Sequence, residues 1–145
     1  MGRRRNPRDS RRYADWINAG YDDLRAAQIL STDDTLNNAA AFHCQQCVEK
    51  ALKGFILFKT HRTVDGHNLT WLCRRAVELD KDFEQWLDES ARLNRYYIET
   101  RYPTDVPTEI DDDDVPLMLE MADALFSYVV NALDLEDQLE LWEAY

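Results

Sequence analysis

Glycine and proline are rare in this chain, and each occurs only four times among 145 residues. A fold made of many short strands is therefore disfavoured, because the tight turns between strands rely on these residues. No apolar run reaches about 18 residues, so we expect no membrane-spanning helix. The basic N-terminus also lacks the apolar stretch of a secretory signal. With 45% hydrophobic residues, the composition suits one helical globular domain.

Cysteine is scarce too, and its odd count argues against a framework of disulfide bonds. We expect Cys44, Cys47 and Cys73 to be free thiols of a cytoplasmic protein. Cys44 and Cys47 follow His43 with C-x-x-C spacing, and Cys73 or His67 would complete four zinc ligands. The pair falls in the middle of an expected helix, whereas structural zinc pairs usually occupy turns. We therefore predict core or interface thiols and no metal site.

Positive charge is concentrated at the N-terminus. Residues 1–12 hold six arginines and one acid, while the rest of the chain holds 11 basic and 27 acidic groups. That acidic body repels nucleic acid over most of its surface, so any nucleic-acid contact requires a local basic patch or the N-terminal arm. Aspartate supplies 18 of the 28 acids, and there are only four lysines. This bias is consistent with a salt-rich cytoplasm, and an ordinary acidic protein is the equal alternative.

Apolar residues recur three or four positions apart in five segments, which is the spacing of a helix with one buried face. These segments are residues 13–30, 36–58, 68–79, 83–100 and 116–132. No alternating strand pattern competes with them, so the sequence predicts an all-α, up-and-down bundle of four to five helices. We expect this bundle to span 13–133, between a disordered basic arm at 1–12 and an acidic C-terminal helical extension at 134–145.

The apolar spacing also predicts which residues face the core. In the first helix this face carries Ile17, Gly20 and Leu24, and Asp23 lies off it. In the last helix the predicted core face consists of Leu117, Met121, Ala124, Leu125, Tyr128, Val129 and Ala132. The acidic run 111–114 lacks the spacing and glycine of a calcium loop, so we expect a solvated helix start there. Glycine-rich phosphate loops and dinucleotide fingerprints are absent, and no cofactor is predicted.

Four polar residues share a stripe on the second predicted helix. His43, Gln46, Lys50 and Lys53 follow one another at steps of three, four and three residues. Two ammonium groups with an imidazole and an amide would suit a phosphate or a nucleotide. The alternative is that the lysines are solvated and that the imidazole and amide are structural. We expect Glu49 to pair with Lys53, or with an arginine from a neighbouring helix.

Further candidates follow later in the chain. His67 stands near the start of the third predicted helix, either as a structural cap or as a ligand contact. Arg95, Arg101 and Tyr102 lie on or just after the fourth helix, and arginine reads phosphate with two donors at once. Alternatively, Arg101 forms an ion pair with Glu49 or another acid inside the bundle.

An ordered set of short motifs runs through four of the predicted helices. They are Trp16 with Asp23-Leu24, His43-x-x-Gln46-x-x-Glu49-Lys50-Ala51-x-Lys53, Gly66-His67-Asn68-Leu69, and Arg101-Tyr102-Pro103. Together they resemble the HEPN domain over about residues 13–133. The resemblance implies a bundle of four or five helices, similar to the helical half of kanamycin-type nucleotidyltransferases. It also implies a small nucleotidyltransferase partner, often in a toxin–antitoxin pair in which the HEPN protein is the ribonuclease toxin.

One departure from the family pattern bears on activity. Ribonuclease members carry an arginine and then, four to six residues later, a histidine near the last core helices. Here no histidine follows His67, and Arg62-x4-His67 has the spacing in the wrong element. We therefore expect a homodimeric module that binds a nucleotide, phosphate or RNA, or pairs with a nucleotidyltransferase, without ribonuclease activity. The alternatives are a toxin ribonuclease using Arg101 with His43 or His67, and an assembly adaptor without a ligand.

Overall fold

A computed structural model describes residues 9–100 and 110–133 of the chain, and every regular element in these ranges is helical. The bundle consists of α1 (Tyr13–Leu30), α2 (Asn37–Thr60), α3 (Leu69–Leu79), α4 (Leu87–Thr100) and α5 (Asp114–Ala132). Two short 3₁₀ helices, η1 (Asp34–Leu36) and η2 (Lys81–Trp86), precede α2 and α4. The predicted all-α fold class is confirmed. The predicted fourth helix is divided, because its first residues belong to η2.

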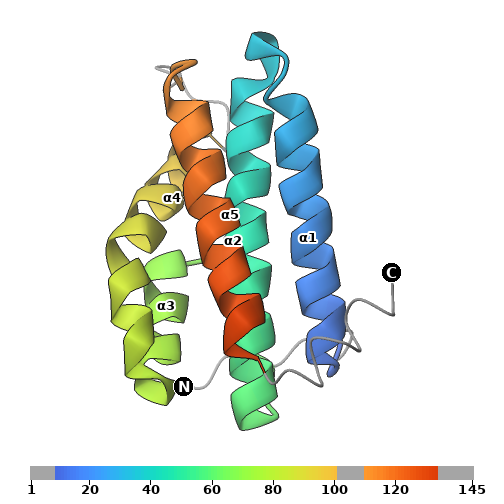
Figure 1. Ribbon diagram of the computed structural model, residues 1–145, viewed down its shortest axis with the longest axis vertical. Coiled ribbons are helices and arrows are strands. Elements are labelled where there is room, and N and C mark those ends of the chain that lie inside the picture. The colour runs from blue at the N-terminus through green and yellow to red at the C-terminus, as the bar shows by residue number, and fades with distance from the viewer. Residues whose placement is uncertain (1–8, 101–109, 134–145) are drawn as a thin grey trace.

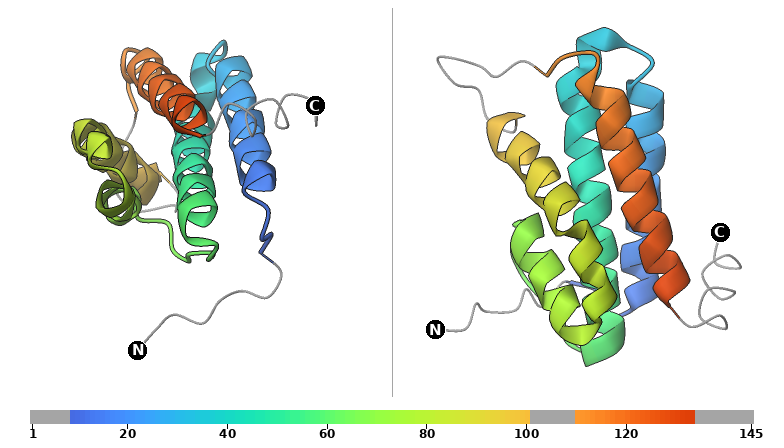
Figure 2. Two further views of the ribbon diagram at one scale, coloured as in Figure 1. Left: turned by 60° about the horizontal axis from the view of Figure 1, so that its bottom comes forward. Right: turned by 60° about the vertical axis from the view of Figure 1, so that its left-hand side comes forward.

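The central element of the bundle is α2. Figure 1 shows α1, α2 and α5 standing side by side, and α2 contacts each of the other four helices. Seen from the side, α3 and α4 cover a different face of α2 from α1 (Figure 2). Most of the length of α2 is therefore buried, including the apolar residues Ala40, Ala41, Cys44, Cys47, Val48, Ala51, Leu52, Phe55, Ile56 and Leu57. Several polar side chains in the middle of this helix, such as Gln45, Glu49 and Lys53, are therefore buried.

Local side-chain hydrogen bonds set several helix ends. The Asn68 side chain accepts from the Trp71 backbone N–H at 3.0 Å and so caps α3. Asp80 does the same for η2 by accepting from the Asp82 N–H. At the end of α2, His61 adopts a left-handed backbone with φ of 59°. The capping alternative for His67 is therefore wrong, because the neighbouring asparagine takes that role.

Two glycines allow α1 and α2 to approach closely. A Cβ atom added to Gly20 would lie 3.1 Å from the backbone carbonyl oxygen of Cys47. A Cβ atom on Gly54 would lie 2.9 Å from Cδ1 of Ile17. The helices meet almost backbone to backbone, which brings the polar residues of α1 into contact with those of α2.

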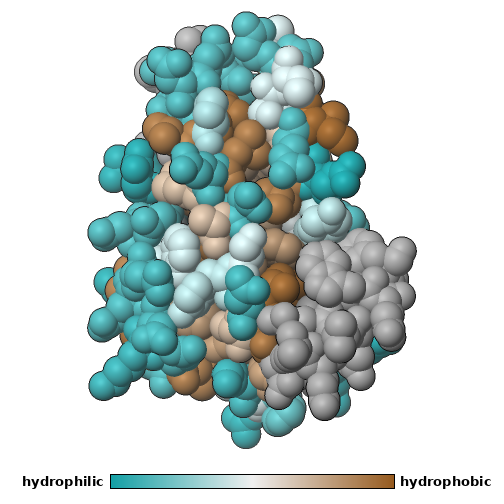
Figure 3. Space-filling view, viewed as in Figure 1, coloured by the Kyte–Doolittle hydropathy of each residue, from teal (hydrophilic) through white to brown (hydrophobic). Residues whose placement is uncertain are grey.

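The core-facing side of α5 differs from the prediction. Its buried residues are Val115, Met118, Ala122, Leu125, Phe126, Val129 and Val130. Leu117 is 48% exposed and Ala124 also faces solvent, so the prediction that both face the core is wrong. The helix is apolar on two sides, and spacing alone selects the wrong one. The outer side is visible as brown and tan patches among hydrophilic residues over α5 (Figure 3).

With apolar residues on two sides, α5 also resembles a membrane-spanning helix, by its length and composition alone. Its inner side packs on α1 and α2 and forms part of the core of the bundle.

Candidate functional site: two carboxylate–histidine–lysine clusters on α2

The first cluster centres on Asp23 of α1. Its Oδ1 atom lies 2.8 Å from Nδ1 of His43, and its Oδ2 atom lies 2.6 Å from Nζ of Lys50. The Asp23 side chain is only 10% exposed. The prediction that Asp23 lies off the core face is wrong, because the close α1–α2 contact turns it toward α2. Both carboxylate oxygens are satisfied there, as a buried charge requires.

The second cluster centres on Glu49 of α2 itself. Its Oε1 atom lies 2.8 Å from Nδ1 of His67, and its Oε2 atom lies 3.3 Å from Nζ of Lys53. The Gln45 side-chain amide donates to Glu49 Oε1 at 3.4 Å and to the His67 carbonyl at 3.1 Å. The predicted Glu49–Lys53 pair is confirmed. The connection that leads into α3 is thereby bound to the middle of α2.

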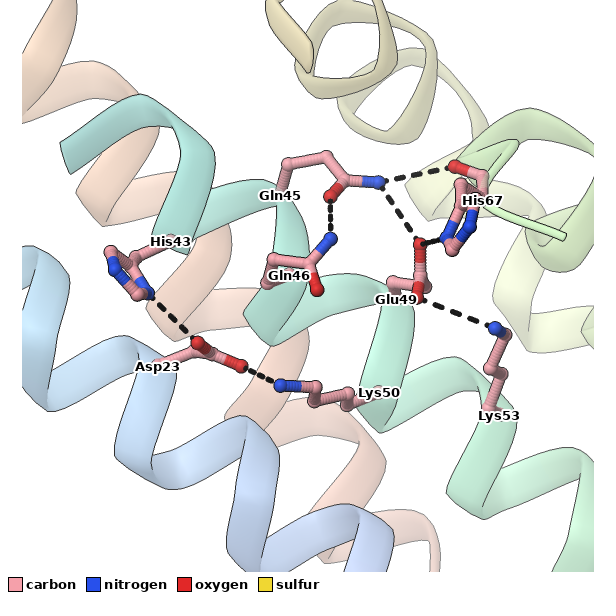
Figure 4. A network of polar contacts seen from close by, with 8 residues as sticks. All are labelled: Asp23, His43, Gln45, Gln46, Glu49, Lys50, Lys53 and His67. Carbon is pink, nitrogen blue, oxygen red and sulfur yellow. Dashed lines mark hydrogen bonds and ion pairs between the residues drawn. The ribbon is translucent and has the colours of Figure 1, made fainter. Parts of the chain in front are cut away.

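The two clusters have the same composition, with one carboxylate, one lysine and one histidine each (Figure 4). When the imidazole is neutral, the charges of each cluster cancel, which limits the cost of burying them. The histidines are the most accessible members, with side-chain exposures of 31% for His43 and 55% for His67. A carboxylate that accepts from Nδ1–H selects the tautomer whose Nε2 atom is an acceptor. Each ring is thus oriented from behind by a buried acid.

The predicted polar stripe does not form one continuous surface. His43 and Lys50 turn toward α1, whereas Lys53 is 8% exposed, with its ammonium group 5.6 Å from the centroid of the Trp16 ring. Gln46 donates its side-chain amide to Gln45 at 2.7 Å and so extends the Glu49 cluster. Both ammonium groups already contact carboxylates, and a phosphate would have to compete with them.

Comparison with known proteins identifies the fold. The family model of the HEPN domain matches residues 13–133, which is most of the chain. This protein belongs to the HEPN family. The crystal structure of TT1696 from Thermus thermophilus is similar, with 28% identity, a TM-score of 0.69, and coverage of 86% of this chain and 100% of that one. ST0689, an archaeal HEPN homologue, gives 23% identity and a TM-score of 0.66, over 85% of this chain and 98% of its own. No curated protein matches the sequence.

The HEPN motifs that carry the resemblance correspond to the two clusters. Asp23, His43, Glu49, Lys53 and His67 all belong to the motif set, and the fold joins them by side-chain contacts. Sequence reasoning missed that Asp23 is the partner of His43. The motif gave one signal of this contact, because its acid, Asp23, lies next to the apolar face of its own helix.

The arginines of α4 are placed only in part. Arg95 is exposed and forms no ion pair with the described residues. Arg101 and Tyr102 lie outside the described residues, and the expected pairing of Arg101 therefore stays a prediction. Of the eight candidate site residues, five lie in the two clusters: His43 and Lys50 in the Asp23 cluster, and Gln46, Lys53 and His67 in the Glu49 cluster.

All three cysteines of this HEPN chain are free and buried. Burial raises the pKa of Cys44 to about 12 and raises the pKa values of Cys47 and Cys73 as well. Such thiols are poor thiolate ligands. Among the described residues, no group of three or more histidine, cysteine, aspartate or glutamate side chains is placed to hold a metal ion.

The buried thiols predict slow alkylation of the folded protein. With a pKa of about 12 in place of 9, Cys44 has a thiolate fraction lower by about a thousandfold at pH 8. Mass spectrometry after iodoacetamide treatment should show no modified cysteine in the native protein and three in urea. Rapid native modification of Cys44 would contradict the packing around α2.

The raised pKa of Cys44 also makes the stability depend on pH. Between about pH 9 and 12 the unfolded chain loses the Cys44 proton while the folded protein keeps it. The free energy of unfolding is therefore unaffected by Cys44 below about pH 9 and falls as the pH rises toward 12.

Proposed function

We propose that this HEPN protein is a non-hydrolytic binding module whose ligand-facing groups are His43 and His67. The observation that supports this most is the position of each imidazole, partly exposed, with Nδ1 2.8 Å from a buried carboxylate. Such rings are oriented before a ligand arrives, so little side-chain freedom is lost on binding. The ligand class is a nucleotide or another phosphate-bearing molecule.

The charge of the clusters defines how such a ligand would be held. Lys50 and Lys53 each contact a carboxylate, so the stripe is not an uncompensated patch of positive charge. Recognition therefore rests more on hydrogen bonds to the imidazoles than on lysine–phosphate attraction, because each neutral ring offers its Nε2 atom as an acceptor to an N–H or O–H group of a nucleotide's base or ribose. Lys50, with a side chain 27% exposed, is the lysine that remains accessible.

A partner protein belongs to the same proposal. Many HEPN-like proteins pair with a small nucleotidyltransferase, as in toxin–antitoxin systems, and we extend that arrangement to a cytoplasmic homodimer of this chain. The outer side of α5, with Leu117 and Ala124 exposed, supplies an apolar surface of the kind that subunit interfaces use. If this surface binds a partner and the clusters bind nothing, the protein is an assembly adaptor.

The test is nucleotide binding measured by calorimetry with the four ribonucleoside triphosphates in turn. The double variant His43→Gln and His67→Gln should weaken binding of the preferred nucleotide by about tenfold or more, since two directed hydrogen bonds are lost. The exposed residue Asn38 of α2 provides a control, and Asn38→Ala should leave the affinity unchanged. Equal affinity for wild type and double variant would refute the role given to the histidines.

The carboxylate-held imidazoles also favour one second candidate, a toxin ribonuclease. An acid that orients a histidine from behind is a common arrangement for a general base. That enzyme would use Arg101 with His43 or His67, and Arg101→Ala would abolish RNA cleavage. Intact RNA after long incubation with the purified protein would exclude it and would leave the binding module in place.

A further inference from the structure

The end of the bundle where α2 stops carries a second polar feature, separate from the two clusters. A hollow of about 290 Å³ is lined by Arg11, His61, Arg62 and Thr63. It lies between the segment leading into α1 and the turn that follows α2. Glu49 and His61 are twelve residues apart, which corresponds to about 18 Å along a helix, so the hollow is not part of the Glu49 cluster.

The lining of this hollow is basic in a protein whose formal net charge is −11. Neither Arg11 nor Arg62 forms an ion pair with a carboxylate among the described residues. The nearby acid Asp15 is engaged otherwise, since it accepts from the Ser10 hydroxyl at 2.7 Å. Two arginines therefore line one small hollow, and neither has a carboxylate partner among the described residues, which favours an anion there.

The backbone on both sides of the hollow is fixed by hydrogen bonds. On one side, Trp16 Nε1 donates to the Ser10 carbonyl at 2.9 Å and the Arg12 N–H donates to Ser10 Oγ at 3.0 Å. On the other side, the His61 N–H donates to the Leu57 carbonyl at 2.8 Å. Arg11 and His61 are thus presented from ordered segments, so their main chains need no reordering on binding.

Thr63 adds a directional group. Its hydroxyl oxygen is buried and has no hydrogen-bond partner among the described residues. A buried hydroxyl without a partner costs free energy, and a rotation of the Thr63 side chain toward the hollow would return it by letting the hydroxyl donate to a ligand oxygen. Arginine forks together with a hydroxyl donor form the donor set that suits a tetrahedral oxyanion.

We propose that this hollow, lined by Arg11, His61, Arg62 and Thr63, is a binding site for a phosphate group. Its volume accommodates a phosphate or diphosphate moiety. The site goes beyond the histidine clusters and stands independently of them. The same chemistry occurs in free inorganic phosphates and in nucleotides, and the experiment separates the two sources.

The test is calorimetry at low ionic strength with pyrophosphate, inorganic phosphate, 5′-AMP and adenosine. Pyrophosphate should bind, and Arg62→Gln should weaken it by about tenfold or more because a charge-assisted contact is lost. Arg74 is exposed and unpaired among the described residues, so Arg74→Gln removes the same charge and should change the affinity less than twofold. AMP that binds more tightly than inorganic phosphate would identify a nucleotide source, and equal affinities would identify the free anion.

Two further variants make the result specific. Thr63→Val should weaken pyrophosphate binding while the far-ultraviolet circular dichroism spectrum stays native. When His43→Gln and His67→Gln are already present, Arg62→Gln should still weaken pyrophosphate binding, so that failure of the histidine site and failure of this site are distinguishable. The proposal is overturned by absence of saturable binding at millimolar pyrophosphate, by equal losses in Arg62→Gln and Arg74→Gln, or by adenosine competing as well as AMP.

Discussion

Replacement of Glu49 by alanine is expected to lower the free energy of unfolding by about 3–5 kcal/mol, the usual cost of leaving one member of a buried ion pair alone. The Glu49 side chain is 4% exposed and accepts from Lys53, His67 and Gln45. Without it, the buried Lys53 ammonium group loses its carboxylate, and the connection leading into α3 loses its contact with α2. Urea denaturation of wild type and variant measures the difference.

A second variant separates the lost charge pair from the lost side-chain volume. Glu49→Met with Lys53→Met removes both charges and fills the space with apolar atoms, which is often neutral or stabilising at buried pairs. This double variant should therefore be more stable than Glu49→Ala. If Glu49→Ala costs less than about 1 kcal/mol, as at exposed pairs, the cluster is not the buried pair described here.

Replacement of Gly20 by valine is expected to destabilise the bundle by about 2–3 kcal/mol through overpacking. The first added carbon already lies 3.1 Å from the Cys47 carbonyl oxygen and 3.4 Å from the Phe126 ring, and the carbonyl belongs to the helix backbone. The two methyl groups of valine then force α1 away from α2. Thermal denaturation measures the loss.

The same displacement carries Asp23 away from His43, because Asp23 follows Gly20 by less than one turn of α1. Gly20→Val should therefore also weaken the nucleotide binding proposed for His43. Ala124→Val is a suitable control, since Ala124 is exposed on α5 and the change should cost under about 1 kcal/mol. Equal stability of the two variants would show that the helices do not touch at Gly20.

The five helices were predictable because each buries one face, and three- or four-residue spacing reports that directly. The prediction was wrong on α5, where Leu117 and Ala124 face solvent, because two apolar sides give the same spacing. It was also wrong for Asp23. A polar residue beside a glycine contact is buried by the neighbouring helix, and spacing within one helix contains no information about that neighbour.

The site was predictable as a set of residue types but not as a set of contacts. The Glu49–Lys53 pair follows from i, i+4 spacing within one helix. The His67–Glu49 and His43–Asp23 contacts join residues 18 and 20 positions apart, and only the packing of separate segments creates them. The basic hollow was hidden for the same reason, since Arg11 and Arg62 line one space only because the start of α1 and the end of α2 lie close together.

The central claim is that the two histidines held by carboxylates face a ligand. Nitrogen-15 spectra of the imidazole side chains, recorded with each of the four ribonucleoside triphosphates, test it most directly. We expect His43 and His67 to carry their neutral-ring proton on Nδ1, and we expect both signals to shift when the preferred nucleotide binds. A shift of His61 alone would point to the basic hollow instead. Unchanged His43 and His67 signals with all four nucleotides would contradict the account.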